Sequence, residues 1–379
     1  MTAPVEIHGV CHERFSTIRD AFVANFEDDL DIGASLGVTW HGRPVVDLWG
    51  GHADLSRTRP WERDTLVHVF STTKIMIIMA TLMLVDRGLI ELDAPVARYW
   101  PAFGQGGKGE VTIRDAMTHQ AGVPGFTPPV AFEALHDWDA IVARVAAEPH
   151  WFEGRRFVSY HFMTYGFILG EVLRRVDGRR PAQFMAEEIA GRADADFQFG
   201  LKSQSDLGRL AELHFPTGTP HAEDSIAARA MASVSLGDWM SWGRLSADIP
   251  ASVGLANGRS IARLCAIFAM RGTLDGARYV SDGMVTEAAT EQVYANDETF
   301  GWLRLGLGLG LNSEPFPAPS PTAFHWGGYG GSWGLMDPSV GLSLGFAPNN
   351  LAPAADTVLT MDPRLFRFHK ALEALIPTL

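Results

Sequence analysis

One long apolar segment limits how this chain can fold. Residues 75–85 read Ile-Met-Ile-Ile-Met-Ala-Thr-Leu-Met-Leu-Val, a run without charge that predicts a buried helix. The run is too short to span a bilayer, which takes about 20 residues. Ser71-Thr72-Thr73-Lys74 stands directly before it. Since positions i and i+3 share a helix face, Ser71 and Lys74 should point into the same small volume.

That placement predicts chemistry at Ser71. A buried lysine without a carboxylate partner tends to lose its proton, and a neutral amine beside a serine hydroxyl can make it a nucleophile. The S-x-x-K pattern occurs once, because Lys108, Lys202 and Lys370 have no serine three places before them. The alternative is a serine that only caps the helix, with an incidental lysine.

Composition excludes several classes of partner and cofactor. The 379 residues are 46% hydrophobic and 20% charged, which is typical of a folded globular protein. The net charge of −13 argues against binding to nucleic acid or to a membrane surface. Residues 1–8 show no signal-peptide pattern, so we expect a cytoplasmic protein. Cys11 and Cys265 lie far apart and no Cys/His cluster has zinc-ligand spacing, so we expect no metal and no cofactor.

Strand patterns lie at both ends of the chain and helical patterns between them. We expect an α/β (α+β) fold, with an antiparallel sheet built from both termini, flanked by helices, and an inserted, mostly helical domain. The predicted domains are 1–72 with 246–379 for the sheet, and 73–245 for the helical part, with the active site at their junction. The sheet domain should contain a helix over 12–30, hairpins over 35–49 and 332–346, and a last helix over 362–375. The helical part should contain helices at 111–119, 131–147, 165–175, 181–190 and 206–215.

Two further segments carry candidate functional residues. Tyr160 comes just before a predicted helix, and near Lys74 and Ser71 it could act as the proton acceptor, because an adjacent cation or polarised lysine lowers the pKa of a tyrosine. An ordinary half-buried tyrosine is the alternative. Residues 324–332 read Phe-His-Trp-Gly-Gly-Tyr-Gly-Gly-Ser before the C-terminal hairpin. Glycines there leave room for a ligand and for backbone N–H groups that face a developing negative charge.

The order of these three motifs resembles that of the serine β-lactamase and penicillin-binding-protein superfamily. The resemblance is to its class C-like branch, and within it to the family VIII carboxylesterases, in which a W-G-G type triplet replaces K-T-G. It extends over nearly the whole chain, including 111–124 and 330–338.

The resemblance implies a role for each matching residue. Ser71 would be the nucleophile, Lys74 its activating partner, and Tyr160 the base in acylation and the acid toward the leaving group. The N–H groups of Ser71 and Tyr329 would form the oxyanion hole. The substrate would contact a strand wall and a pocket formed by Trp326, Gly327, Gly328, Phe126, Phe162, His325 and Trp333.

Two departures from the β-lactamase motifs bear on the substrate. Phe162 stands where Y-x-N would have an asparagine, and Trp326 stands where a lysine would hold the carboxylate of a β-lactam. A lost charge-assisted hydrogen bond costs about 1.5–3 kcal/mol, roughly one to two decades in binding. Both changes favour neutral esters with apolar acyl groups.

Several other patterns have simpler interpretations. The G-x-S-x-G matches at Ser35 and Ser332 lack the strand-then-helix context of a nucleophile elbow. We expect His119 to satisfy a local hydrogen bond and His325 to be a wall residue rather than a base. The alternating Leu-Gly run at 305–311 opens no helix, so we expect a close-packed strand.

The favoured function is a serine carboxylesterase acting on a small ester with a short or medium acyl chain. A β-lactamase, a D-amino-acid peptidase and an acyltransferase share the acyl-enzyme and remain alternatives. A catalytically silent ligand-binding protein is the alternative outside enzymes. The sequence leaves the oligomeric state open.

Overall fold

A nine-stranded antiparallel sheet, built from both ends of the chain, organises the structure. This computed structural model describes residues 5–215, 225–235, 240–314, 317–352 and 362–379, and the strand count refers to these. The strand order is β1-β3-β2-β16-β15-β14-β13-β12-β11. Its members are β1 (Ile7–Cys11), β2 (Gly33–Trp40), β3 (Arg43–Gly51), β11 (Val293–Asp297), β12 (Gly301–Leu305), β13 (Gly310–Leu311), β14 (Phe324–Gly327), β15 (Trp333–Asp337) and β16 (Leu342–Pro348). The predicted fold class is confirmed, since β16 from the C-terminal part pairs with β2 from the N-terminal part.

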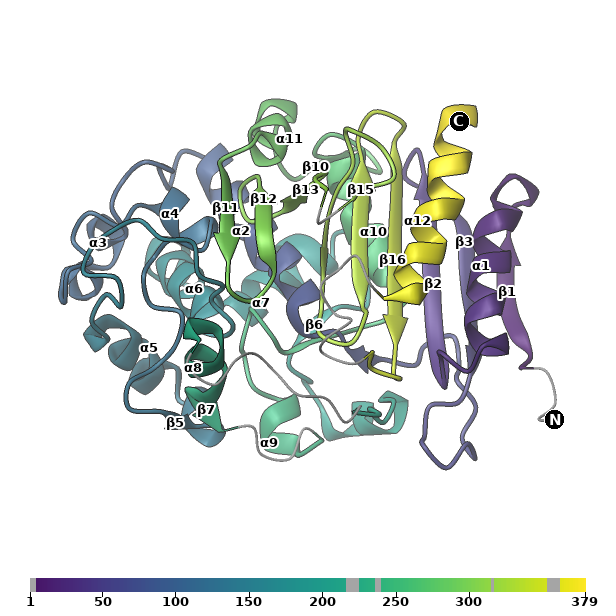
Figure 1. The fold of residues 1–379 in the computed structure, drawn as a ribbon, viewed down its shortest axis with the longest axis horizontal. Helices are drawn as coiled ribbons and strands as arrows, with labels where there is room; N and C mark the ends of the chain where they lie inside the picture. The colour runs from purple at the N-terminus through teal and green to yellow at the C-terminus, as the bar shows by residue number, and fades with distance from the viewer. Residues whose placement is uncertain (1–4, 216–224, 236–239, 315–316, 353–361) are drawn as a thin grey trace.

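Helices cover both faces of the sheet and form a separate layer beside it (Figure 1). The α-helices are α1 (Ser16–Glu27), α2 (Lys74–Asp86), α3 (Val96–Tyr99), α4 (Ile113–Met117), α5 (Trp138–Ala147), α6 (Thr164–Asp177), α7 (Pro181–Phe184), α8 (Ile226–Ala232), α9 (Trp242–Leu245), α10 (Gly258–Ala269), α11 (Asp282–Ala289) and α12 (Pro363–Leu375). Short helical turns are η1 (Glu13–Phe15), η2 (Phe70–Thr73), η3 (Pro101–Gly104), η4 (Phe132–His136), η5 (Met185–Ala190), η6 (Gln204–Arg209) and η8 (Ile376–Thr378). No helix in these described ranges is both long and apolar enough to cross a bilayer.

Seven short strands among the described residues form small sheets separate from the nine-stranded one. They are β4 (Val67–His68), β5 (Val130–Ala131), β6 (Gln198–Phe199), β7 (Val234–Ser235), β8 (Gly254–Ala256), β9 (Thr273–Leu274) and β10 (Ala277–Arg278). In the order β4-β8-β6, β8 lies between the other two and pairs antiparallel with each. Because β4 immediately precedes η2, this pairing fixes where the chain enters the Ser71 turn.

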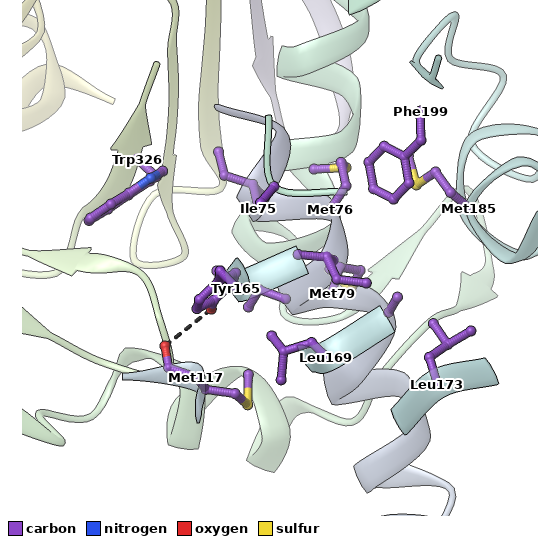
Figure 2. Packing of buried hydrophobic residues seen from close by; sticks show 14 of the residues in the cluster. Ile75, Met76, Met79, Met117, Tyr165, Leu169, Leu173, Met185, Phe199 and Trp326 are labelled. Atoms are coloured by element: carbon purple, nitrogen blue, oxygen red, sulfur yellow. Dashed lines mark hydrogen bonds between the residues drawn. The ribbon is translucent and has the colours of Figure 1, made fainter. Parts of the chain in front are cut away.

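Helix α2 is the centre of the larger hydrophobic core. Its side chains are apolar on every face, and all of them from Lys74 to Leu84 are buried. It packs against α6, and Figure 2 shows Leu169 near Met79, while Met76 lies toward Phe199 and Met185. The helix ends at Asp86 with Arg87 as its C-cap, and Gly88 follows in the left-handed region (φ +70°), as its sequence predicts.

The sheet carries a different core on each face. Helices α1 and α12 pack together on one face, over Phe22, Phe346 and Phe368. Helix α10 packs on the other face, against β2, β15 and β16. Its approach is close, because a Cβ at Gly37 would lie 2.5 Å from the Arg259 Cα and one at Gly345 would lie 2.3 Å from the Gly258 carbonyl oxygen.

The close approach of α10 also explains the G-x-S-x-G match at Ser35. Gly37 provides space for the helix, and the Ser35 hydroxyl accepts a hydrogen bond from the Gly258 N–H at 2.9 Å. Ser35 lies inside strand β2 and is buried. The motif therefore serves packing.

Two predicted elements differ from the structure. The expected helix at 206–215 is the short turn η6 followed by extended chain, in which Leu210 bridges to Leu66. Buried Leu213 between exposed Glu212 and His214 has the period of a strand, which explains the difference. The run at 305–311 bends between β12 and β13, because Gly308 adopts φ +80° against the Tyr165 hydroxyl.

A buried ion cluster attaches α12 to the sheet. The Arg364 guanidinium, 2% exposed, donates to Asp31 at 2.8 Å and to Asp362, the N-cap of α12, at 2.7 Å. It also donates to the Gly330 carbonyl oxygen at 2.6 Å. Burial raises the pKa of Asp31 to about 6, although the Arg364 charge opposes this. The cluster thus connects the C-terminal helix to the turn that follows β14.

Replacing Arg364 should destabilise the fold strongly. Arg364→Leu would leave two buried carboxylates without their cation, so the free energy of unfolding should fall by about 3–5 kcal/mol. Urea denaturation measures this. The control is Arg367→Leu on the same helix, which removes a partly exposed ion pair with Asp28. Its free energy of unfolding should fall by less than about 1 kcal/mol. Equal effects of the two substitutions would contradict a structural role for the cluster.

Candidate active site

The Ser71 turn is held rigidly between β4 and α2. Ser71 lies in the turn η2, and the preceding Phe70 adopts a positive φ of +45°, which is rare for an aromatic residue. The Ser332 hydroxyl donates to the Val69 carbonyl oxygen at 2.8 Å and lies 2.9 Å from the Thr72 hydroxyl. These contacts tie both sides of the turn to the sheet and leave Ser71 half-buried at its surface.

Lys74 is buried at the start of α2 and reaches back to Ser71. Its Nζ lies 3.3 Å from Ser71 Oγ and donates to the carbonyl oxygens of Phe162 and Ala251, each at 3.0 Å. Burial lowers the pKa of Lys74 well below its usual value. A neutral amine has two N–H groups and one lone pair. In the neutral form, which the lowered pKa of Lys74 favours, both N–H groups would lie on the carbonyls and the lone pair would face the Ser71 hydroxyl.

Tyr160 approaches Ser71 from another side. Its hydroxyl donates to Ser71 Oγ at 2.7 Å, and its ring centre lies 4.6 Å from Lys74 Nζ. Burial raises the pKa of Tyr160 well above its usual value; the contacts with Ser71 and Trp326 oppose the shift, and the charge of Asp297 adds to it. The phenol is therefore protonated in this state. The structure brings Ser71, Lys74 and Tyr160 into one hydrogen-bonded group.

The segment after β14 runs along the other side of Ser71. A Cβ at Gly328 would lie 2.2 Å from the Val69 carbonyl oxygen and 3.1 Å from the Ser71 backbone nitrogen, so only glycine fits there. Gly327 ends β14, and the Trp326 ring centre lies 6.0 Å from that of Tyr160. The Tyr329 ring packs edge-on against Phe70, 5.5 Å between centres. This wall places the backbone of 327–329 beside the Ser71 turn.

A small apolar cavity borders this group. It has a volume of about 190 Å³. Its walls come from the Ser71 turn, the segment after Tyr160, the α8 region and the wall after β14. They are formed by Phe70, Phe162, Met163, Phe215, Ala230, Met231, Val234, Ser252 and Tyr329. Phe162 and Tyr329 thus lie where a substrate group would be held.

Three of the predicted pocket residues lie elsewhere. Strand alternation puts His325 on the opposite face of β14 from Trp326, where its Nδ1 accepts a bond from the Trp333 indole at 3.2 Å. Trp333 packs in the core beneath α1 and α12. Phe126 is buried in the helical core, with the Arg144 guanidinium 5.9 Å from its ring centre, and does not line the cavity. The expectation of pocket roles for these residues is corrected accordingly.

His119 is buried behind Tyr160 rather than making a local bond. Its Nδ1 accepts the His161 N–H at 3.2 Å, and its ring centre lies 4.7 Å from that of Tyr160. Burial lowers the pKa of His119 well below its usual value, so the ring is neutral. Ser332 lies in the turn between β14 and β15 and supports the Ser71 turn, without the helix that a nucleophile elbow requires.

Sequence reasoning missed the residue that holds the Tyr160 backbone. Asp297, 1% exposed at the end of β11, accepts the Tyr160 N–H at 2.7 Å. Phe300, from the same hairpin, packs edge-on against the Tyr160 ring at 4.8 Å. These two residues lie about 140 positions from Tyr160, and no local pattern in 293–305 indicates the contact. The weak signal available was Asn-Asp-Glu-Thr at 296–299, because asparagine and aspartate are typical of a turn.

Comparison with known proteins agrees with this geometry. The family model described as Beta-lactamase matches residues 22–362. The esterase/beta-lactamase LipL of Mycobacterium tuberculosis is 34% identical over 295 residues, 74% of this chain and 68% of LipL. The crystal structure of a family VIII carboxylesterase is 38% identical with a TM-score of 0.89, covering 98% of this chain and 100% of that one.

A second solved structure extends the same relationship. A penicillin-binding-protein homologue from Caulobacter crescentus is 35% identical, with a TM-score of 0.88 over 98% of this chain and 100% of that one. The resemblance to the β-lactamase and penicillin-binding-protein superfamily, and to family VIII carboxylesterases, is confirmed. The chain therefore belongs to the β-lactamase family and is a hydrolase of the esterase/β-lactamase fold.

Proposed function

We propose that the protein is a serine carboxylesterase that hydrolyses neutral esters with short or medium apolar acyl chains through an acyl-enzyme on Ser71. The observation that carries this proposal is the pair of contacts on one oxygen: Ser71 Oγ lies 2.7 Å from the Tyr160 hydroxyl and 3.3 Å from Lys74 Nζ. A hydroxyl between a neutral amine and a phenol has a proton acceptor and a proton donor within reach.

In acylation, Lys74 would take the proton of Ser71 as Oγ attacks the ester carbonyl carbon. The sequence suggested Tyr160 as the base, but its raised pKa and the lone pair on Lys74 favour the amine. The tetrahedral oxyanion would lie against the N–H groups of Ser71 and Tyr329. As the C–O bond breaks, Tyr160 would give its proton to the leaving alkoxide, which leaves an ammonium and a phenolate 4.6 Å apart, from Nζ to ring centre.

In deacylation the same protons would return. Water attacks the acyl carbon and gives a proton to the Tyr160 phenolate. Ser71 Oγ then leaves and takes back the proton held by Lys74. The sum of the two steps is one ester and one water converted to an acid and an alcohol, with all three side chains restored.

The cavity supports an apolar acyl group. Its lining residues carry no formal charge, and six of the nine are aromatic or methionine. An anionic substrate would bury its carboxylate there without a cation, which costs several kcal/mol. Trp326 and Phe162, in place of the lysine and asparagine of β-lactamase motifs, favour the same substrate class.

β-Lactamase activity is the second candidate, because the name of LipL includes it. It requires the same acyl-enzyme and differs in how the acyl side chain and the carboxylate are held. Transfer of the acyl group to another alcohol, cleavage of D-amino-acid peptides and catalytically silent ligand binding remain alternatives to ester hydrolysis.

Removing the Ser71 hydroxyl should abolish turnover without unfolding the protein. For Ser71→Ala we expect kcat/KM on p-nitrophenyl butyrate to fall at least about a thousandfold. A fluorophosphonate should label the wild type once, with the mass shift on the peptide that contains Ser71. The control is Ser35→Ala, the remote G-x-S-x-G serine, which should keep both labelling and turnover. Labelling of another serine, or none, would overturn the proposed function.

The ratio of two substrate activities tests the substrate class. Turnover of p-nitrophenyl butyrate should exceed that of a chromogenic cephalosporin by at least about tenfold in kcat/KM, because the cephalosporin carboxylate would have no cation to pair with. Steady-state rates on one enzyme preparation measure both. Faster hydrolysis of the cephalosporin would reverse the assignment in favour of a β-lactamase.

The pH dependence tests which group is the base. The activity kcat/KM should rise through the lowered pKa of Lys74 and level off below about pH 10, the ordinary pKa of tyrosine. A rise that continues above pH 10 would instead identify the Tyr160 phenolate as the base.

Stability should follow the same titration. The unfolded chain carries a lysine with a pKa near 10.4, whereas the native amine is neutral to lower pH, so the unfolded state binds the extra proton. The free energy of unfolding of the wild type should therefore rise with pH, relative to Lys74→Met, up to about 10.4. Urea denaturation at several pH values compares the two slopes, and parallel slopes would mean that native Lys74 is charged.

A further inference from the structure

The hairpin between β11 and β12 ends in a buried carboxylate that serves two segments. Asp297 Oδ1 accepts the N–H groups of Thr299 at 2.8 Å and Phe300 at 3.1 Å, which closes the turn. Its Oδ2 accepts the Tyr160 N–H at 2.7 Å. The turn needs only the first oxygen, because an asparagine closes such turns as well.

The second oxygen needs another explanation, since a buried charge is costly. Asp297 is 1% exposed, and the ion pairs found among the described residues do not include it. Burial raises the pKa of Asp297, and the three N–H groups oppose this. A carboxylate at this position therefore reduces stability relative to a neutral side chain of the same shape. Its contact with Tyr160 offers a functional reason for that cost.

The hairpin fixes both ends of Tyr160. Asp297 holds its backbone, while Phe300 packs edge-on against its ring with 4.8 Å between centres and 78° between planes. Phe162 contacts the ring from another direction, also edge-on, at 4.9 Å. With both the backbone and the ring fixed, the phenol oxygen has little freedom to move away from Ser71 Oγ.

We propose that Asp297 is a positioning residue that holds Tyr160 as the proton donor to the leaving alcohol, so that the enzyme cleaves esters of unactivated alcohols. The proposal rests on the proposed function. An alkoxide is a poor leaving group and needs the Tyr160 proton as the C–O bond breaks, whereas p-nitrophenolate leaves without it. If the phenol is displaced by a fraction of an ångström, the rate of alkyl ester cleavage should fall far more than the rate of p-nitrophenyl ester cleavage.

The chain offers a matched control at the end of β15. Asp337 is also buried and ends its strand, and its Oδ1 accepts the Ser339 N–H at 2.9 Å in the next hairpin turn. Its other contacts are the hydroxyls of Ser320, Thr322 and Ser339, none of which lies in the site. Asp337→Asn therefore removes the same charge from the same kind of turn without touching Tyr160.

The experiment compares two esters across three variants. Asp297→Asn can keep the turn through its amide oxygen but directs an NH₂ group at the Tyr160 N–H. Asp297→Ser keeps a small acceptor for the turn and is too short to reach Tyr160. With Asp337→Asn, these are assayed for kcat/KM on ethyl butyrate and p-nitrophenyl butyrate, which differ only in the alcohol.

The expected result is a change in leaving-group dependence. In both Asp297 variants kcat/KM should fall about tenfold or more on ethyl butyrate and by a far smaller factor on p-nitrophenyl butyrate. In Asp337→Asn any change in kcat/KM should be the same for the two esters. Equal losses on both esters, or none, would overturn the proposal. Failure of both Asp297 variants to fold, with Asp337→Asn folded, would also overturn it, since Asp297 would then hold the hairpin rather than the phenol. Failure of the proposed function is distinct, because the wild type itself would then lack fluorophosphonate labelling.

Discussion

The arrangement around Ser71 depends on one buried amine. Lys74 is fully buried, and the ion pairs identified among the described residues do not include it, so its charged form is disfavoured. Its two hydrogen bonds join segments that are distant in sequence: the Phe162 carbonyl lies just before α6 and the Ala251 carbonyl just before β8. Three parts of the chain thus meet at one nitrogen. Any displacement of these segments would leave polar groups unsatisfied in the core.

On the side of the site away from Lys74, two side chains hold the turn between β14 and β15. Ser332 binds the Ser71 turn, and Arg364 binds the Gly330 carbonyl oxygen from the C-terminal helix. The turn that carries Tyr329 is therefore held between the Ser71 turn and α12. The Ser71 turn, near the N-terminal end of the chain, therefore needs the β14–β15 pair from the C-terminal part to form its second wall. The two ends of the chain form one sheet, and the Ser71 turn contacts both its strand β14 and helix α2.

The sequence was sufficient for those features that depend on local pattern. The apolar run at 75–85 predicted a buried helix, and the spacing of Ser71 and Lys74 predicted that their side chains would meet, as they do. The strand patterns at both ends of the chain predicted the fold, and the order of three motifs predicted the family. Long-range contacts were not predictable in this way. Asp297 reaches Tyr160 through a hairpin whose place in the sheet depends on all the strands before it. The pocket roles that the resemblance implied for His325 and Trp333 did not take strand alternation into account.

The charges of Lys74 and Tyr160 explain why the site suits a neutral substrate. The lowered pKa of Lys74 favours the neutral amine and the raised pKa of Tyr160 favours the neutral phenol, and with both neutral the buried group carries no net charge. In the proposed cycle it forms an ammonium and a phenolate together, and their mutual attraction offsets part of the cost of burying each. A substrate carboxylate in the adjoining cavity would add an unbalanced charge among aromatic and methionine side chains. The preference for neutral esters is therefore a consequence of how the serine is activated, in addition to the shape of the pocket.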